Sequence, residues 1–324
     1  MGVQRIQRLI VAVSVALAPL TFTSAVGAQA TAPPSTGGTV GSRPVGEVVV
    51  TGKLGRPPKG FSTDVSDFVA SHSQPSPIGL LSRWMTPVCP TVVGLSPRFT
   101  DFVTKRITEV AVRVGAPHRG RCRRSNVRVV FTAQPQKLMD HVRDKFPDLL
   151  GFHYPREEKA LATFQGPIDS WHVTGTRDAS GGGYADSTNN DRNPQIAFGG
   201  HPTMSGANAS RLRGSASSEF LFALVVIDPG RVPKQPIGKV ADQIALLVLT
   251  NPKRPRSCSP LPTLMDALDS ACPASASVAS LTPYDESFLT GLYASDAEES
   301  AALQQGTVAR RIEKGRPADL GQSE

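Results

Sequence analysis

The chain has 324 residues, a hydrophobic fraction of 39% and a formal net charge of +8 at pH 7. Much of the basic excess lies in two short runs, "HRGRCRR" (118–124) and "NPKRPRS" (251–257). Neither run is accompanied by an aromatic platform or a groove-reading helix, so we expect solvated turns and no nucleic-acid partner.

The N-terminus is typical of an export signal. Two arginines precede an apolar run over residues 9–20, and Ala28 and Ala30 are small residues at the two positions that a signal peptidase reads. The apolar run is well short of the about 20 residues that a membrane-spanning helix needs. We therefore predict a cleaved signal peptide over residues 1–30, no later transmembrane segment, and a soluble mature protein in the periplasm or secreted.

Residues 31–85 are rich in proline, glycine, serine and threonine, with little periodic apolar surface. Such a composition cannot fold alone, which predicts a disordered tether. One stretch inside it is different, because "EVVVTG" is built of β-branched residues that suit a strand. This segment consists of Glu47, Val48, Val49, Val50, Thr51 and Gly52.

Four cysteines follow the signal peptide, and an even number in an exported chain suggests two disulfides. Three connectivities are possible, and the spacing favours the two local pairs. A zinc cluster is the alternative, but the chain has no CxxC pair. The expected pairs are Cys89 with Cys122 and Cys258 with Cys272.

Residues 86–312 carry the signals of a single domain. Apolar residues at helical spacing predict helices, and β-branched or continuous apolar runs predict strands. The helices are expected at 96–115, 135–150, 237–250, 281–296 and 299–312, and the strands at 126–132, 160–175 (one strand or two) and 219–230.

Three details of these elements can be tested. The first helix should use Phe99, Phe102, Ile107, Val110 and Val114 as its core face. The strand at 219–230 is apolar throughout and should be central and fully buried. Thr282 should cap the helix that follows it.

This order of elements predicts an α+β fold, a mixed sheet packed by helices on one face. The glycine-rich stretch 174–218 is expected to be a mobile loop within the domain. The tail over residues 313–324 should be disordered.

Several stretches make the chain familiar. "FQGPIDSWHVTGTRDASGG", "LFALVVIDPGRVPKQPIGKVADQIALLVLTNP", "LPTLMDAL" and "LTPYDESFLTGLYASD" resemble a family of exported Gram-negative bacterial proteins of unknown function, over about residues 88–312. The resemblance implies a fold and no activity.

The buried strand followed by an apolar helix is also similar to the layout of zincin-like metallopeptidases. Zincins hold zinc with two histidines four residues apart on one helix. The corresponding stretch here, "ADQIALL" (241–247), has no histidine, and the chain has no HxxxH pair. We therefore expect at most a degenerate zincin-like protein with no metal site and no cofactor.

No other catalytic motif is present, since the chain lacks a GxSxG elbow, a Walker loop and a GxGxxG fingerprint. His172, beside Trp171, is the first candidate for a catalytic or ligand-binding residue, in a cleft formed with the loop that follows. The alternative is an edge-strand residue with a solvent-facing ring. No catalytic residue is assigned.

The segment 47–52 resembles the TonB box of outer-membrane TonB-dependent receptors, although the chain has neither their plug nor their barrel strands. Such a segment binds by adding a strand to an exposed sheet edge; packing on its own domain is the alternative. The resemblance implies a periplasmic protein partner. Two function classes follow: a non-enzymatic envelope binding or adaptor protein, or an unrecognised hydrolase with its site near His172.

Overall fold

The structure is a computed structural model that describes residues 62–120, 122–151, 155–178, 183–186, 216–232, 235–253, 258–267, 272, 275 and 277–315. All of them belong to one compact unit, Gly52–Glu324. The predicted signal peptide, the segment 47–52, residues 187–215 of the predicted loop and residues 316–324 lie outside the described residues.

A five-stranded mixed sheet forms the centre of the domain, with the strand order β1-β2-β5-β3-β4. Strands β1, β2 and β5 are parallel, whereas β3 is antiparallel to β5 and β4 is antiparallel to β3. The predicted apolar strand is β5, and its central place is confirmed, although Leu221 and Phe222 are half-buried and not fully buried as predicted. The strands are β1 (Pro90–Val93), β2 (Val127–Phe131), β3 (Ile168–Asp178), β4 (Gly183–Ala185) and β5 (Ala216–Ile227).

Seven α-helices of the described chain surround the sheet, and none is long and apolar enough to cross a membrane. The predicted cap on α7 is confirmed, because Thr282 and Asp285 form a capping box. The helices are α2 (Thr63–His72), α3 (Pro97–Arg113), α4 (Pro135–Lys145), α5 (Glu158–Leu161), α6 (Ile237–Leu249), α7 (Pro283–Ala294) and α8 (Ala301–Lys314), with short 3₁₀ helices η1 (Pro147–Leu150), η2 (Pro155–Glu157) and η3 (Leu264–Asp266).

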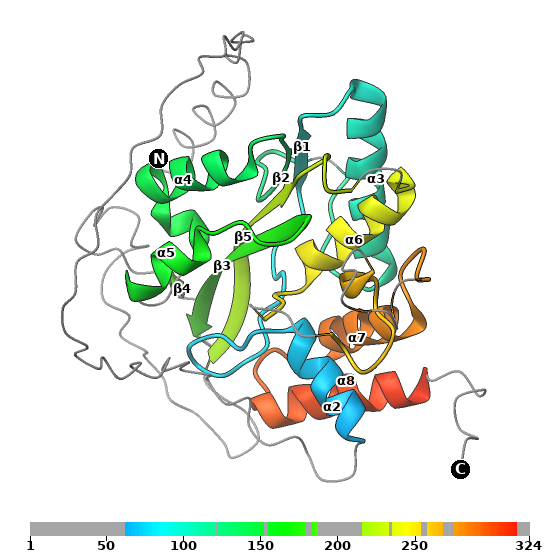
Figure 1. The fold of residues 1–324 in the computed structure, drawn as a ribbon. Coiled ribbons are helices and arrows are strands. Elements are labelled where there is room, and N and C mark those ends of the chain that lie inside the picture. Colours follow the sequence, from blue (N-terminus) through cyan, green and yellow to red (C-terminus); the bar gives the residue numbers. More distant parts are fainter. Residues whose placement is uncertain are drawn as a thin grey trace, which may run out of the picture. The chain divides into compact units, whose positions relative to one another are not determined.

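Helices cover both faces of the sheet, which corrects the predicted one-sided packing. Figure 1 shows α4 and α5 on one side and α3 and α6 on the other. The larger core lies on the α3 and α6 side and extends to α2, α7 and α8; the smaller one lies beneath α4 and α5. The cause is that every residue of β2 is buried, so both faces of the central strands are apolar and need a cover.

The core face of α3 differs from the predicted one. Ile107, Val110 and Val114 are buried as predicted, together with Val103 and Ala111. Phe99 and Phe102, in contrast, are 42% and 43% exposed. Phe102 lies four positions before Arg106, and residues at this spacing share one face of a helix. Phe102 is therefore on the charged face of α3.

Residues 62–85 belong to the domain, which corrects the predicted extent of the tether. They contain α2, whose Val65, Phe68 and Val69 join the main core. Trp84 is 1% exposed and its indole Nε1 donates to the carbonyl of Val248 at 2.8 Å. The apolar residues of α2 occupy a short part of a 55-residue stretch that is otherwise rich in proline, glycine, serine and threonine, so the overall composition does not indicate the helix.

The bounds of the predicted mobile loop are corrected at both ends. Strand β3 continues to Asp178, β4 pairs with it, and β5 begins at Ala216, so both ends of the 174–218 stretch lie in the sheet. At the start of the predicted 160–175 strand, the chain forms the end of α5, and β3 begins only after Pro167.

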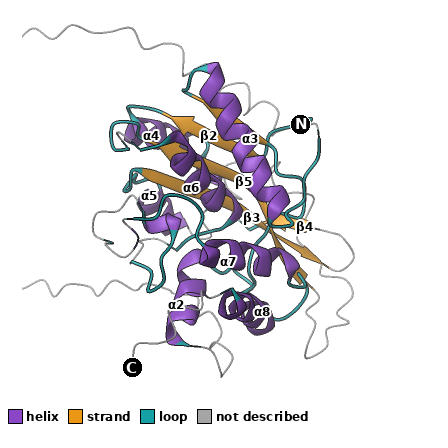
Figure 2. Ribbon diagram, turned by 90° about the vertical axis from the view of Figure 1, so that its right-hand side faces the viewer, coloured by secondary structure: helices purple, strands orange, loops and turns teal. Residues whose placement is uncertain are grey.

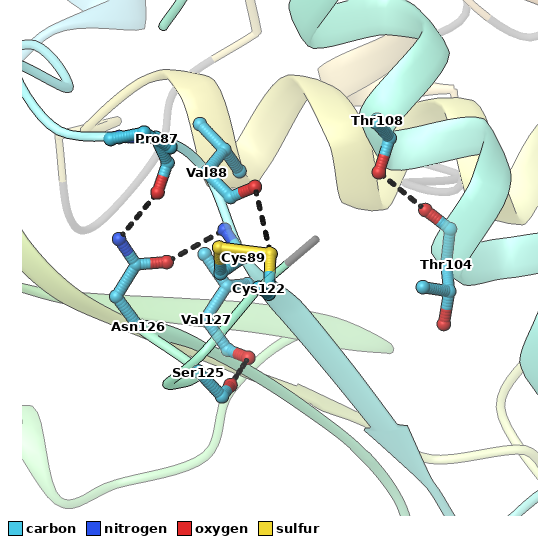
Figure 3. Close-up of a disulfide and its surroundings, with 9 residues drawn as sticks. All are labelled: Pro87, Val88, Cys89, Thr104, Thr108, Cys122, Ser125, Asn126 and Val127. Atoms are coloured by element: carbon cyan, nitrogen blue, oxygen red, sulfur yellow. Dashed lines mark hydrogen bonds between the residues drawn. A yellow bond between two sulfur atoms is a disulfide. The ribbon is translucent and has the colours of Figure 1, made fainter. Parts of the chain in front are cut away.

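Both expected disulfides are confirmed, Cys89–Cys122 and Cys258–Cys272. The first lies at the N-terminal ends of β1 and β2 (Figure 3). There the side chain of Asn126 accepts from the Cys89 amide at 2.8 Å and donates to the Pro87 carbonyl at 3.0 Å. Disulfides of this kind are typical of proteins in an oxidising compartment.

Candidate functional site

A hollow of about 390 Å³ lies beside the C-terminal half of α2. Its other walls are the segment after α6, the Cys258–Cys272 loop and η3. We call it the α2 pocket, and the side chains important below are Asp67, Ser71, His72, Lys253, Thr263 and Asp266. Its volume is within the range of small-molecule sites.

The floor of the pocket is a buried polar network around His72. The imidazole Nδ1 lies 2.9 Å from the Phe68 carbonyl, and Nε2 lies 3.0 Å from the Thr263 hydroxyl and 3.3 Å from a carboxylate oxygen of Asp285. Both His72 and Asp285 are fully buried. The network thus connects α2, η3 and α7 inside the core.

The contacts of Asp285 decide where the protons lie. Its Oδ1 accepts the Thr263 hydroxyl proton at 2.6 Å, and its Oδ2 accepts from the amides of Leu264 and Thr282 at 2.9 and 3.0 Å. Since Thr263 has given its only proton to Asp285, the His72 Nε2 must donate to this pair. A carbonyl can only accept, so Nδ1 donates as well. Both ring nitrogens of His72 therefore act as donors in this network.

Ser71 does not form a nucleophile and base pair with His72. Its hydroxyl lies 3.1 Å from the His72 Nδ1, but that hydroxyl donates to the Phe68 carbonyl at 2.8 Å. Because Nδ1 already carries a proton, it cannot take one from Ser71. The pocket is better suited to binding than to acyl transfer.

The predicted candidate His172 lies elsewhere and is buried, 4% exposed, on β3. Its ring packs 4.8 Å from that of Phe220, with Nε2 3.4 Å from the Val248 carbonyl. Both expectations for this ring, a cleft and a solvent-facing position, are wrong because α6 covers this part of the sheet.

The other predicted sites have different outcomes. The segment 47–52 lies outside the described residues. Residues 241–247, where a zincin would carry its histidines, are buried in α6. In the described part of the chain, no group of three or more histidine, cysteine or acidic side chains is placed to hold a metal ion.

Sequence reasoning missed the α2 pocket, because its parts are far apart along the chain. His72 is 191 positions from Thr263 and 213 from Asp285. One local signal was available, the "TPYD" sequence (282–285), which is a capping box with aspartate in place of glutamate.

Comparisons of the chain with protein-family models, with curated proteins and with solved structures each gave no match. The family resemblance of residues 88–312 and the TonB-box resemblance of residues 47–52 therefore remain expectations from the sequence.

Proposed function

We propose that the chain is an exported binding or adaptor protein of the cell envelope, which captures a periplasmic protein through residues 47–52. We call this stretch the docking segment. It adds a strand to an exposed sheet edge of the partner, and its backbone supplies most of the hydrogen bonds. The single observation that carries the proposal is the β-branched "EVVVTG" sequence in an otherwise proline- and glycine-rich stretch.

The position of the docking segment supports this role. Ten residue steps separate Gly52 from Ser62, and a chain of that length spans at most about 35 Å. Helix α2, which begins at Thr63, is packed into the main core. A partner captured by the segment is therefore tethered to the folded domain through these ten residue steps.

The two disulfides support export, because such bonds persist in oxidising compartments. The hydrolase alternative has less support. Its candidate His172 is buried, and Ser71 and His72 have the wrong proton arrangement for a nucleophile and base.

The test is a crosslinking pull-down from envelope extracts with four chains: the mature protein, a deletion of residues 47–52, Val49→Pro and Val49→Thr. Proline removes a backbone donor from the strand, whereas threonine keeps β-propensity. We expect one specific partner to be captured by the mature chain and by Val49→Thr, and lost with the deletion and with Val49→Pro. A partner set that is the same for all four chains would refute docking.

A further inference from the structure

We propose that the α2 pocket binds a small zwitterion, a molecule with one ammonium group and one carboxylate, such as a free amino acid or a short peptide. The ammonium group contacts Asp67 and the carboxylate contacts Lys253. This site goes beyond the docking segment and does not depend on it.

Two oppositely charged residues line the pocket from different walls. Asp67 lies on α2, and Lys253 lies on the segment that follows α6; both are exposed and both line the hollow. They form no ion pair with each other, and neither side chain bonds to another residue of the described chain. One ligand that carries both charges can satisfy both groups at once.

The remaining charged groups of the pocket already have partners. His72 faces Asp285, and the Asp266 Oδ2 accepts from the Ser259 amide at 2.7 Å. Among the described residues that line it, the pocket therefore offers a ligand one acid and one base. A simple cation would leave Lys253 unmatched and a simple anion would leave Asp67 unmatched, so a dipolar ligand fits best.

The walls that carry the two charges are fixed to each other. The Lys253 amide donates to the Ser71 carbonyl at 3.3 Å, and the Gln74 amide donates to the Asn251 carbonyl. The Cys258–Cys272 disulfide holds the wall beyond. Because the backbone positions of Asp67 and Lys253 are set before binding, the ligand does not have to order them.

A titration followed by NMR tests this site on the mature chain, residues 31–324. The probes are glycine, diglycine and triglycine, which separate the same two charges by increasing distances. We expect saturable shifts at the amides of Ala70 and Lys253 with at least one probe. For that probe, the N-acetylated and the C-terminally amidated forms, which each lack one charge, should bind about threefold to tenfold more weakly.

Matched variants assign the two contacts. Asp67→Asn should remove the preference for a free ammonium group, and Lys253→Gln the preference for a free carboxylate. Asp64→Asn, an exposed acid on the same helix, and Lys145→Gln, an exposed base on α4, should change neither.

Absence of saturable shifts with all three probes, at a limit of about 10 mM in Kd, would overturn the proposal. Equal binding of the singly charged forms would overturn it too. Neither result would affect the docking segment, which lies outside this pocket and is tested by the pull-down.

Discussion

Thr263 is the residue on which the buried network depends. Its hydroxyl donates to Asp285, accepts from the Met265 amide at 3.1 Å and contacts His72. It thus serves three groups with a single oxygen. Without that oxygen, a buried amide loses its acceptor and the His72 Nε2 loses its nearest partner, so the polar floor of the pocket is no longer satisfied.

We therefore expect Thr263→Val, which preserves shape, to lower the free energy of unfolding by about 2–3 kcal/mol. Thr290→Val is the control, because the Thr290 hydroxyl only donates to the Glu286 carbonyl within α7. That variant should cost well under about 1 kcal/mol. Urea unfolding measures both variants. If Thr263→Val and Thr290→Val lowered the free energy of unfolding equally, the network would not stabilise the domain.

Two buried arginines differ in what surrounds them. Arg83 and Arg128 are 4% and 5% exposed, and burial lowers the pKa of both guanidinium groups. Arg83 donates to the carbonyls of Ser295 and Asp296 at 2.5 and 3.5 Å, and nearby Tyr293, Asp296 and Glu299 oppose the lowering. Arg128, on β2, has no hydrogen bond or ion pair to the described residues, so burial acts on its charge unopposed.

The two arginines should thus respond oppositely to removal of charge. Arg128→Met should raise the free energy of unfolding by about 1 kcal/mol, since it replaces an uncompensated buried charge with an apolar chain. Arg83→Met should lower it by about 2 kcal/mol, because two carbonyls lose a charged donor. Urea unfolding of both variants measures the two changes. If Arg128→Met lowered the free energy of unfolding as much as Arg83→Met does, Arg128 would have an anionic partner in the native protein.

At the level of elements, the sequence predicted those whose pattern is local. Helices α3, α6, α7 and α8 and strands β2 and β5 have long periodic or continuous apolar runs, and all are present. Strand β1 and helix α5 were missed because four residues are too few to show a period. The pocket could not be predicted, since it needs three distant segments to meet.

Helices α7 and α8 are held at close range by a glycine. A Cβ on Gly291 would lie 2.9 Å from the Val308 Cα and 3.3 Å from the Arg311 Cβ, atoms that cannot turn away. Gly238, in the first turn of α6, has nothing within 4 Å of the same position. Gly291 and Gly238 therefore differ in the room that a Cβ would have, whereas neither has the positive φ that would strain an alanine.

Alanine should consequently have opposite effects at these positions. Gly291→Ala is expected to lower the free energy of unfolding by about 1–3 kcal/mol through overpacking. Gly238→Ala should raise it by about 0.4–1 kcal/mol, because alanine has less freedom to lose on folding. Thermal melts of both variants provide the test, and a stabilised Gly291→Ala would mean that α7 and α8 can move apart.

For the whole molecule, the important correction is the N-terminal boundary of the domain. A truncation that begins at residue 62 keeps α2 and Trp84, whereas one that begins at residue 86 loses the core side chains Val65, Phe68 and Trp84. Fully burying each such side chain contributes about 1.5–3 kcal/mol, so their combined loss is comparable to the stability of an ordinary domain.

We expect the chain that begins at residue 62 to unfold cooperatively at the same temperature as the mature protein. The chain that begins at residue 86 should lack a cooperative transition. Calorimetry distinguishes the two. If the shorter chain unfolded cooperatively at the same temperature, residues 62–85 would not be part of the folded domain.

Helices α2 and α8 lie side by side, and both views show them together (Figures 1 and 2). The hydroxyl of Ser62, just before α2, donates to the carboxylate of Glu313, the penultimate residue of α8, at 3.3 Å. The described part of the folded domain therefore has its first residues and its last helix next to each other. A protein with this geometry can be spliced into an exposed loop of an unrelated host, because both junctions need to span no more than the width of a turn.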